Sequence, residues 1–384
     1  MTPVSEPSSR VRAAFVFEQT LGHVTHFRNL RDFAAQQSVV EPAWLPIQFE
    51  VTGAARLLPV LRSNWSVRAS WRARRALDAA LARSPLDALF FHTQTTSLFS
   101  ISLMRRIPTV VSMDATPINY DSLGEHYGHR PANDGFLDRQ KYQLNRAAFQ
   151  AATRLVTWSD WARRSLIDDY GIEGDRVRVL APGAATAFFE IGRARAADPE
   201  RDNRGGRVKI LFVGGDFRRK GGFALLDCLH GSLADSCELH VVTQSDVPPL
   251  PNVFVYRNLQ ANSLELQRLY ADADLFALPT MADCLAIVLT EAMAAGLPVI
   301  TTDVGPLAEV VKHGESGLVV PSGDTDALRA ALAALAADAP RRTRMGQAGH
   351  ALARQKFDSH RNNQLLLDLV VDLAQGRQAT RRAA

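Results

Sequence analysis

Cysteine is scarce in this sequence: three cysteines, Cys228, Cys237 and Cys284, occur among 384 residues. They form no CxxC pair and have no metal-ligand spacing to a histidine, so they indicate neither a disulfide framework nor a zinc site. Disulfides are rare in reducing compartments, and a chain with this cysteine pattern is expected to remain reduced. The sequence therefore predicts a cytoplasmic protein.

Long apolar runs are also missing. The apolar run near the N-terminus covers only residues 13–17, and no stretch approaches the roughly 18 apolar residues that a membrane-spanning helix needs. Neither a secretory signal nor an integral membrane segment is expected. The net charge is +4 and the pI about 9.1, which is too mild over this length to indicate nucleic-acid binding. A hydrophobic content of 46% is enough for the cores of two domains.

Two common nucleotide motifs are absent. No GxGxxG follows the strand predicted at residues 13–17, and no GxxxxGK[ST] occurs, so neither a dinucleotide cofactor nor a Walker loop is expected. Instead, a loop containing Gly22 leads from that strand into a helix that carries His23 and His26. Ligands of open parallel sheets gather at the carboxyl ends of the strands, so both histidines would lie near a ligand. The alternative is that each is an ordinary polar residue of the helix.

The most informative stretch is residues 275–304, LFALPTMADCLAIVLTEAMAAGLPVITTDV. It predicts a strand over 275–278, a loop, an amphipathic helix and a second strand over 297–302, which together make a βαβ unit. Asp283 precedes the helix and Glu291 lies on it. Carboxylates accept hydrogen bonds from hydroxyls, and the free N–H groups of a helix N-terminus bind anions. This arrangement suits a ligand with both phosphate and hydroxyl groups.

A second loop, GGDFRRKGG at residues 214–222, follows a strand predicted at Val208–Val213. The loop is rich in glycine, basic and placed before a helix, which is typical of a phosphate site. Its candidate ligand-binding residues are Gly214, Gly215, Arg218, Arg219 and Lys220.

Both stretches resemble signatures of the group 1 family of retaining glycosyltransferases with the GT-B fold. The family's acidic pattern is an acid, seven residues, Glu, Ala-Met-Ala, Gly and Pro-Val. Here it reads Asp283, Glu291-Ala292-Met293-Ala294, Gly296, Pro298-Val299. The family also has a pattern of Gly-Arg, four residues and Lys-Gly. In this sequence Lys220 stands at the position of its lysine, and Gly215 stands at the position of its arginine. The resemblance is strong over Val208–Val320 and loose before it.

This resemblance implies an α/β protein with two Rossmann-like domains that face each other across a cleft. The expected domains are an acceptor-binding domain at residues 1–188, a nucleotide-sugar-binding domain at residues 207–360, and a C-terminal helix at residues 361–384 that crosses back to the first domain. The interdomain linker is expected at residues 189–206, because the segment after Phe189 is rich in charged residues, contains glycine and has almost no large apolar residue.

The resemblance also implies roles for individual residues. Asp283 would bind hydroxyls of the donor sugar, Glu291 the ribose, and Lys220 the diphosphate, with Gly22 beside it. Because Gly215 replaces the family's arginine, Arg218 or Arg219 is expected to supply the missing charge. The family's usual Gly-Phe-Gly after the first acid is here Cys284-Leu285-Ala286, which would line the donor site.

The first domain offers candidates for the acceptor side. Strands predicted at residues 87–91 and 107–113 lead to His92 and Asp114. In the family, the second of these strand ends commonly presents a histidine near the reacting carbon. We assign His23, His92 and Asp114 to the acceptor side, and Asp114, Lys220 and Asp283 to catalysis. The alternative for Asp114 is a turn residue that caps the following segment.

A basic segment covers residues 56–83. Its single acid is Asp78, and Trp65 and Trp71 are interleaved with its arginines: Arg56, Arg62, Arg68, Arg72, Arg74, Arg75 and Arg83. Basic residues with tryptophans can hold a protein against an anionic bilayer, in this case the inner face of the cell membrane. The alternative is a solvated helix face.

The sequence thus predicts a retaining hexosyltransferase that moves a sugar from a nucleotide-sugar donor to a glycan or lipid-linked acceptor, in bacterial cell-surface polysaccharide or lipopolysaccharide biosynthesis. Neither a cofactor nor a nucleic-acid partner is expected. The string Asp272-Ala273-Asp274 spells DxD, but it precedes the amino end of a strand, so no metal is expected there. Two alternatives are a sugar-nucleotide epimerase on the same fold and an inactive nucleotide-sugar-binding protein. The inactive-protein alternative is motivated by Gly215, Asp283 and Leu285, which depart from the family's pattern.

Overall fold

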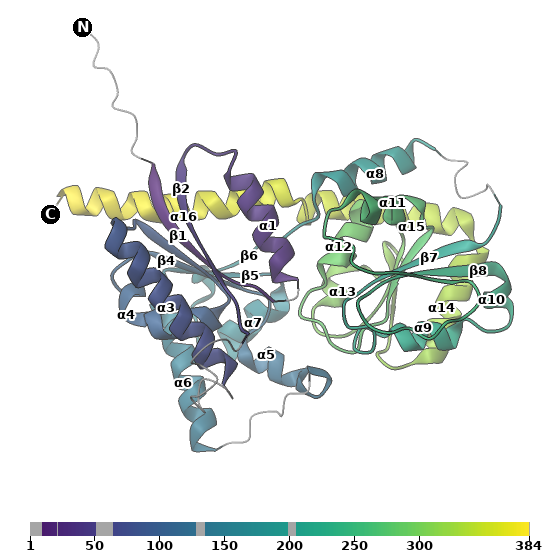
Figure 1. Cartoon of the computed structure of the whole chain (residues 1–384), viewed down its shortest axis with the longest axis horizontal. Helices are drawn as coiled ribbons and strands as arrows, with labels where there is room; N and C mark the ends of the chain where they lie inside the picture. The colour runs from purple at the N-terminus through teal and green to yellow at the C-terminus, as the bar shows by residue number, and fades with distance from the viewer. Residues whose placement is uncertain (1–9, 21, 51–63, 128–134, 199–204, 384) are drawn as a thin grey trace, which may run out of the picture.

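The computed structural model describes residues 10–383 except residue 21 and residues 51–63, 128–134 and 199–204. Within these residues the chain forms two parallel sheets of six strands each, both covered by helices, which lie side by side as two domains (Figure 1). Strands β3, β4, β10 and β11 inside the sheets are fully buried, as expected for parallel sheets with both faces covered, whereas the edge strands β2, β6 and β9 are partly exposed. The fold is therefore α/β with two domains.

The first sheet has the strand order β2-β1-β3-β4-β5-β6. Its strands are β1 Val11–Glu18, β2 Val40–Ile47, β3 Ala88–His92, β4 Thr109–Met113, β5 Arg154–Thr157 and β6 Val177–Val179. Its helices are α1 His23–Ala34, α3 Trp65–Arg83, α4 Ile101–Met104, α5 Pro117–Ser122, α6 Phe136–Ala151 and α7 Asp160–Asp168. Short 3₁₀ turns are η2 Gln94–Thr96, η3 Leu98–Ser100, η4 Gly124–Tyr127 and η5 Gly174–Arg176.

The second sheet has the order β12-β11-β10-β7-β8-β9. Its strands are β7 Val208–Val213, β8 Cys237–Val242, β9 Val253–Tyr256, β10 Leu275–Leu278, β11 Val299–Thr302 and β12 Gly317–Val320. Its helices are α8 Thr186–Ala196, α9 Gly222–Cys228, α10 Ser232–Ser236, α11 Leu264–Asp272, α12 Ile287–Ala294, α13 Leu307–Val310, α14 Thr325–Ala337 and α15 Ala339–Lys356. The expected βαβ unit is β10-α12-β11, and Gly296, with φ +71°, ends the helix.

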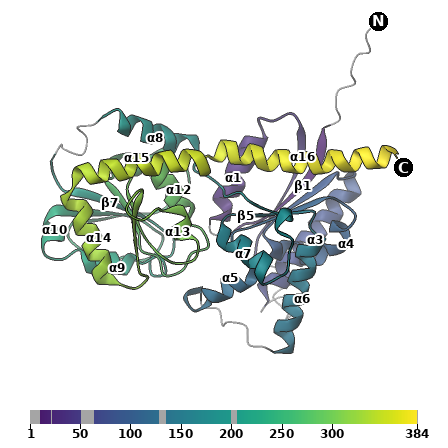
Figure 2. The same cartoon turned by 180° about the vertical axis from the view of Figure 1, so that it is seen from behind.

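The C-terminal helix α16, Ser359–Ala383, leaves the second domain and runs along the first (Figure 2). Its residues Leu366, Leu367, Val370 and Ala374 are buried in one of the two core clusters of the first domain. Where it begins, a short parallel bridge joins Ala184 to Asp358, so the two chain crossings between the domains are hydrogen-bonded to each other.

The segment expected to be a linker is partly helical. Helix α8 extends to Ala196 and packs on the core of the second domain through Phe188, Phe189 and the partly buried Ile191. Arg195 also donates hydrogen bonds to the carbonyl oxygens of Ala295 (3.2 Å) and Ala273 (2.7 Å). A charged composition did not prevent core packing, because the few apolar residues share one helix face.

No helix among the residues that the structure describes is both long enough and apolar enough to cross a membrane.

Candidate active site between the two domains

Lys220 and Asp283 come together at the carboxyl edge of the second sheet. Lys220 lies in the loop between β7 and α9, and Asp283 lies in the loop between β10 and α12. The Lys220 Nζ forms an ion pair with the Asp283 Oδ2, and both side chains are mostly buried. The next residue, Gly221, has φ +80°, and an added Cβ would lie 1.9 Å from the Pro279 carbonyl oxygen. Glycine is therefore required for these two loops to approach each other.

Glu291 is buried on helix α12, where its Oε2 accepts a 2.9 Å hydrogen bond from the Tyr270 hydroxyl. Burial raises the pKa of Glu291 to about 7, although the hydrogen bond from Tyr270 acts in the opposite direction. This carboxylate can accept further hydrogen bonds from a hydroxylated ligand.

The two arginines expected to replace the family's arginine lie differently. The Arg219 guanidinium donates to the Ala282 carbonyl (2.7 Å) and to Asp216 (3.2 Å), and it lies 4.6 Å from the ring centre of Tyr127. Arg219 is thus a buried connection between two loops of the second domain and η4 of the first. The Arg218 guanidinium lies over the Phe223 ring at 4.9 Å. Gly215 faces open space, because no atom lies within 4 Å of an added Cβ.

The first domain contributes a chain of three side chains. Glu18 ends β1, His23 begins α1, and Asp114 follows β4. The His23 Nδ1 contacts the Glu18 Oε1, and the His23 Nε2 lies 3.1 Å from the Asp114 Oδ2. Burial alone would lower the pKa of His23, but the charges of Glu18 and Asp114 raise it to about 10. Asp114 is therefore held by a charged imidazole instead of acting as an isolated turn residue.

His26 and His92 surround His23 without sharing its charge. The His92 ring stacks on Trp158 with the ring centres 5.0 Å apart, and it meets His23 edge-on at 4.6 Å. Burial and the charge of His23 lower the pKa of His26 to about 3 and that of His92 well below its ordinary value. Both rings are neutral packing groups behind His23, and His92 is not exposed to a ligand.

Residues of the two domains approach each other at Gly22 and at Cys284. A Cβ on Gly22 would lie 3.8 Å from the Ile287 side chain at the start of α12. The Cys284 thiol lies 4.0 Å from the Tyr127 hydroxyl. Burial, followed by the negative charges of Asp114 and Asp283, raises the pKa of Cys284 well above its ordinary value. Carboxylates from both domains therefore act on the same buried thiol.

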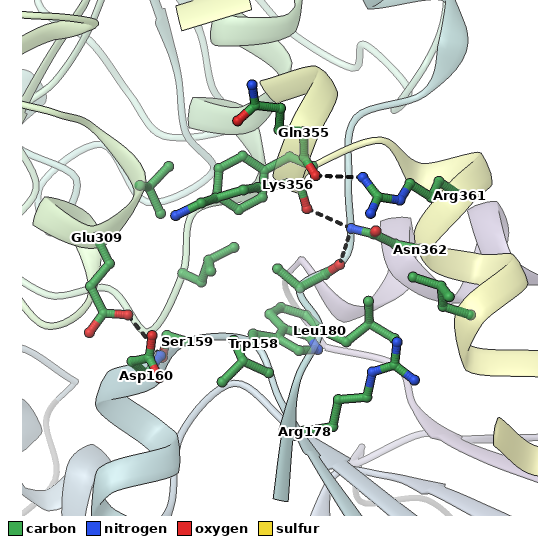
Figure 3. Close-up of a pocket in the computed structure, with 16 residues that line it drawn as sticks. Trp158, Ser159, Asp160, Arg178, Leu180, Glu309, Gln355, Lys356, Arg361 and Asn362 are labelled. Atoms are coloured by element: carbon green, nitrogen blue, oxygen red, sulfur yellow. Dashed lines mark hydrogen bonds between the residues drawn. The ribbon is translucent and has the colours of Figure 1, made fainter. Parts of the chain in front are cut away.

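Cys284, Leu285 and Ala286 are all buried. The raised pKa keeps the Cys284 thiol protonated, whereas Leu285 lines a cavity. This cavity of about 330 Å³ lies beside the two chain crossings, where Trp158 and Leu180 of the first domain face Glu309 and Lys356 of the second (Figure 3). Asp114, Lys220, Asp283 and Glu291 do not line it. The cavity therefore adjoins the candidate active site without including these four residues, because Trp158, which lines it, also contacts His23.

The structure brings together five of the residues singled out in the sequence, namely His23, Asp114, Lys220, Asp283 and Cys284. Gly22 faces the start of α12, and Glu291 lies further along that helix. The sequence analysis missed Glu18, Tyr127 and Tyr270, each of which contacts one of these residues or Arg219. The only sequence signal for Glu18 is an acid at the carboxyl end of an apolar strand.

The DxD residues lie at the opposite edge of the second sheet. The Asp274 Oδ2 accepts a 2.8 Å hydrogen bond from the backbone N–H of Lys209, one residue into β7. Asp274 thus joins the amino ends of two neighbouring strands. Within the described part of the chain, no group of three or more histidine, cysteine or carboxylate side chains is arranged to hold a metal ion.

Two family models match the chain. One, described as glycosyl transferases group 1, matches residues 250–351, and the other, described as a glycosyl transferase 4-like domain, matches residues 24–183. Together the two matches span more than half of the chain and include parts of both domains.

Curated relatives match parts of the sequence. The D-inositol 3-phosphate glycosyltransferase of Nocardia farcinica is 30% identical over 224 residues, which are 51% of this chain and 47% of that protein. The phosphatidyl-myo-inositol mannosyltransferase of Mycobacterium leprae is 36% identical over 159 residues, or 39% of this chain and 42% of that protein. The chain thus spans about half the length of the curated relatives it matches.

Solved structures match the fold over almost the whole chain. Sucrose-phosphate synthase from Thermosynechococcus elongatus superposes with a TM-score of 0.70 at 16% identity, covering 96% of this chain and all of that one. HepE of Anabaena, in complex with UDP and glucose, gives a TM-score of 0.66 at 15% identity, covering 94% and 99%. WaaG, a glycosyltransferase involved in lipopolysaccharide biosynthesis, gives 0.63 at 20% identity, covering 94% and 99%. These likenesses identify the fold as GT-B.

Proposed function

Because the chain belongs to the group 1 glycosyltransferases, we propose that it transfers a sugar from a nucleotide-sugar donor to an acceptor hydroxyl in the cleft between its domains. One observation carries this proposal. The charges of Asp283, which pairs with Lys220 in one domain, and of Asp114, which pairs with His23 in the other, both act on the Cys284 thiol.

The second domain suits a nucleotide-sugar in three places. The ribose hydroxyls would donate to Glu291, the diphosphate would take the charge of Lys220, and the sugar hydroxyls would donate to Asp283. Donor binding would thus replace the ion pair between Lys220 and Asp283 with one phosphate contact and one hydroxyl contact. Neither buried group would be left unpaired, which would otherwise be costly.

Departure of the nucleoside diphosphate develops negative charge on its oxygens. Lys220 and the N-terminus of α12 would stabilise this charge more in the transition state than in the ground state. We further propose transfer with retention, in which the leaving phosphate takes the proton of the acceptor hydroxyl. Asp114 would orient that hydroxyl.

The names of the relatives suggest classes of acceptor. Curated relatives are named for D-inositol 3-phosphate and for phosphatidyl-myo-inositol, and one structural neighbour is involved in lipopolysaccharide biosynthesis. We propose a phosphorylated or lipid-linked polyol or glycan as acceptor, in the synthesis of a bacterial cell-surface glycan. This would place the protein in the cytoplasm, at the inner face of the membrane.

A two-stage screen tests the proposed function. Thermal unfolding with uridine, guanosine, adenosine and cytidine diphosphates should reveal one that stabilises the fold, by about 2.7 kcal/mol at a hundredfold excess over Kd. The matching sugar nucleotides are then offered with D-inositol 3-phosphate, phosphatidyl-myo-inositol and a lipopolysaccharide core. Acceptor-dependent release of the diphosphate supports transfer. Conversion of the donor without acceptor would indicate an epimerase, and binding without turnover across this panel would count against an enzyme.

We expect transfer to need no divalent metal. Lys220 and the N-terminus of α12 can stabilise the negative charge of the diphosphate. Asp274 instead accepts a hydrogen bond from the backbone of Lys209 at the amino ends of the strands. Protein stripped of metal should therefore turn over equally with and without excess EDTA. Activity that is lost in EDTA and restored by magnesium or manganese would contradict this expectation.

Helix α3 is proposed to bring the first domain to an anionic membrane. Trp65 and Trp71 are 45% and 40% exposed on this helix, and the Arg75 guanidinium lies 4.9 Å from the Trp71 ring centre. Arg56 and Arg62 of the basic segment lie outside the described residues. Helix α6 of the same domain also begins with two exposed apolar residues, Phe136 and Leu137.

Sedimentation with liposomes tests this membrane proposal. Binding should require anionic lipid, weaken with salt and fall several-fold in a Trp65→Ala, Trp71→Ala double variant. Phe254→Ala, which removes an exposed aromatic residue from the second domain, is the matched control and should bind like the wild type. Equal binding to neutral and anionic liposomes would leave α3 as a solvated helix.

A further inference from the structure

Glu18 is buried, and both oxygens of its side chain have hydrogen-bonding neighbours. Its Oε1 accepts from the Thr20 hydroxyl at 2.9 Å and contacts the His23 Nδ1, and its Oε2 accepts from the Thr93 hydroxyl at 2.7 Å. Both oxygens of Glu18 thus face threonine hydroxyls that can donate to them, and the raised pKa of His23 places the proton between Glu18 and His23 on the Nδ1.

This arrangement determines the state of the other ring nitrogen. With Nδ1 protonated, the Nε2 of a neutral imidazole would present a lone pair to the Asp114 Oδ2, 3.1 Å away. Two acceptors cannot form a hydrogen bond, so one further proton must lie between Nε2 and Oδ2. Because two carboxylates flank the ring, that proton belongs on the imidazole, and Asp114 remains ionised.

The other rings that contact His23 are uncharged. His26 on α1 and His92 at the end of β3 approach the ring, but burial and the charge of His23 lower the pKa of both, so both are neutral. Trp158, which follows β5, meets the ring edge-on at 5.5 Å. On the cleft side, Asp114 faces the phenols and thiol of Tyr120, Tyr127 and Cys284, and burial raises the pKa of all three.

We propose that Glu18, His23 and Asp114 form a charge relay in which Glu18 and His23 are positioning residues that hold the Asp114 carboxylate ionised and aimed at the acceptor hydroxyl. The side chain of Asp114 is 19% exposed, whereas those of Glu18 and His23 are 6% and 11% exposed, so Asp114 is the member open to the cleft. This inference rests on the proposed function, because it assigns the relay to the acceptor step of that transfer.

The relay makes the acceptor step depend on the charge of His23. A neutral imidazole with its proton on Nδ1 has no donor for Asp114, which would then rotate or take up a proton itself. Glu18 opposes this loss of charge, because its negative charge raises the pKa of His23. Removing an opposite charge at this distance typically lowers such a pKa by about one to three units. In Glu18→Gln, His23 should therefore lose its proton near pH 7–8, about two to three units below the wild-type value of about 10.

NMR titration of the histidine ring nitrogens tests the charge of His23 directly. The signals of His23 are assigned by their loss in His23→Gln. Wild-type His23 should remain charged from pH 6 to 9, and Glu18→Gln should bring its titration into that range. If Glu18→Gln does not fold, Asp114→Asn serves as the second variant, because it removes the other carboxylate at a more exposed position. A wild-type His23 that is neutral at pH 7 would overturn the relay.

Kinetics test the positioning role. The assay uses the donor and acceptor that give the highest turnover in the panel above. Glu18→Gln should lower kcat/KM for the acceptor about 10–100-fold at pH 9 but less than about threefold at pH 6. The reason is that His23 in this variant is largely uncharged at pH 9 and still charged at pH 6. The Kd for the nucleoside diphosphate should not change. Glu41→Gln, on the exposed edge strand β2, is the matched control.

The outcomes separate this inference from the proposed function. A Glu18→Gln enzyme whose acceptor kinetics have the wild-type pH profile would overturn the relay and leave the transferase function intact. If wild-type protein transfers no sugar to any acceptor, the proposed function fails, and the acceptor role of Asp114 fails with it. The NMR result would still decide whether Glu18 sets the charge of His23.

Discussion

Replacing Lys220 with alanine is expected to lower kcat for sugar transfer by about 10²–10³-fold. The Lys220 ammonium is the cation nearest to Asp283 and lies in the glycine-rich loop of the second domain, where a diphosphate would bind. Its charge would be needed most when the phosphate departs, so kcat should fall by more than donor affinity. Measurement of kcat and KM in the variant, with donor Kd by calorimetry, checks the expected result.

Stability must be separated from catalysis, because Lys220→Ala leaves Asp283 buried without its partner. The double variant Lys220→Ala, Asp283→Asn removes both charges and should regain thermal stability without regaining activity. Lys209→Ala, an exposed lysine at the other edge of the same sheet, should behave like the wild type. If Lys220→Ala turns over normally, Lys220 does not bind the diphosphate.

Replacing Glu291 with alanine is expected to weaken binding of the nucleoside diphosphate by about 1.5–3 kcal/mol, or roughly 10–150-fold in Kd. Among the described residues, the Tyr270 hydroxyl is the one group that donates to Glu291, so ribose hydroxyls can donate to its remaining lone pairs. Calorimetric titration of the wild type and the variant measures the difference. Unchanged affinity would show that the ribose binds elsewhere.

The pH dependence provides a second test of Glu291. Its pKa of about 7 means that the free protein holds a proton on this carboxyl below neutral pH, so nucleotide affinity should rise from pH 6 to 8 and then level off. For stability the sign is opposite. A raised carboxyl pKa stabilises the fold below the ordinary value of 4.5, and this contribution is lost as pH rises through 7.

Two variants isolate the role of Glu291. Glu291→Gln should abolish the change in affinity between pH 6 and 8. Tyr270→Phe removes the hydrogen bond that lowers the pKa of Glu291, so the same rise in affinity should move to higher pH. An unchanged pH profile in both variants would exclude Glu291 as the titrating group.

Local patterns in the sequence predict much of the second domain. Residues 210–213 of β7 and Leu275–Leu278 of β10 are unbroken apolar runs, and such runs are typical of strands inside a sheet covered on both faces. The helix between Asp283 and Gly296 has a clear end at a glycine with positive φ. Because these signals are local, the positions of Asp283 and Glu291 follow from the sequence.

Edge elements are harder to predict from the sequence. Strand β2 contains Pro42 and Pro46, which ordinarily argue against a strand. Within the described part of the chain it pairs with β1 alone, at the edge of the sheet, where the missing N–H groups of these prolines are tolerated. Similarly, the charged segment after Phe189 does not look like core, yet α8 packs on the second domain through one narrow apolar face.

Contacts between distant residues could not be predicted from sequence patterns. Glu18 and Asp114 are joined through His23 although Glu18 ends β1 and Asp114 follows β4, and no spacing rule relates them. Arg219 and Arg218 are chemically equivalent in the sequence. Only the fold shows that Arg219 is turned inward to Ala282 and Tyr127. Tertiary packing therefore assigns the roles that the motif leaves open.

A crystal structure with the nucleoside diphosphate that most stabilises the protein tests the central claim most directly. The proposed function predicts that the ribose hydroxyls contact Glu291 and that the diphosphate lies on Lys220 at the glycine-rich loop, with the ion pair between Lys220 and Asp283 broken. A nucleotide bound in the cavity beside Trp158 and Lys356, with that ion pair intact, would contradict it.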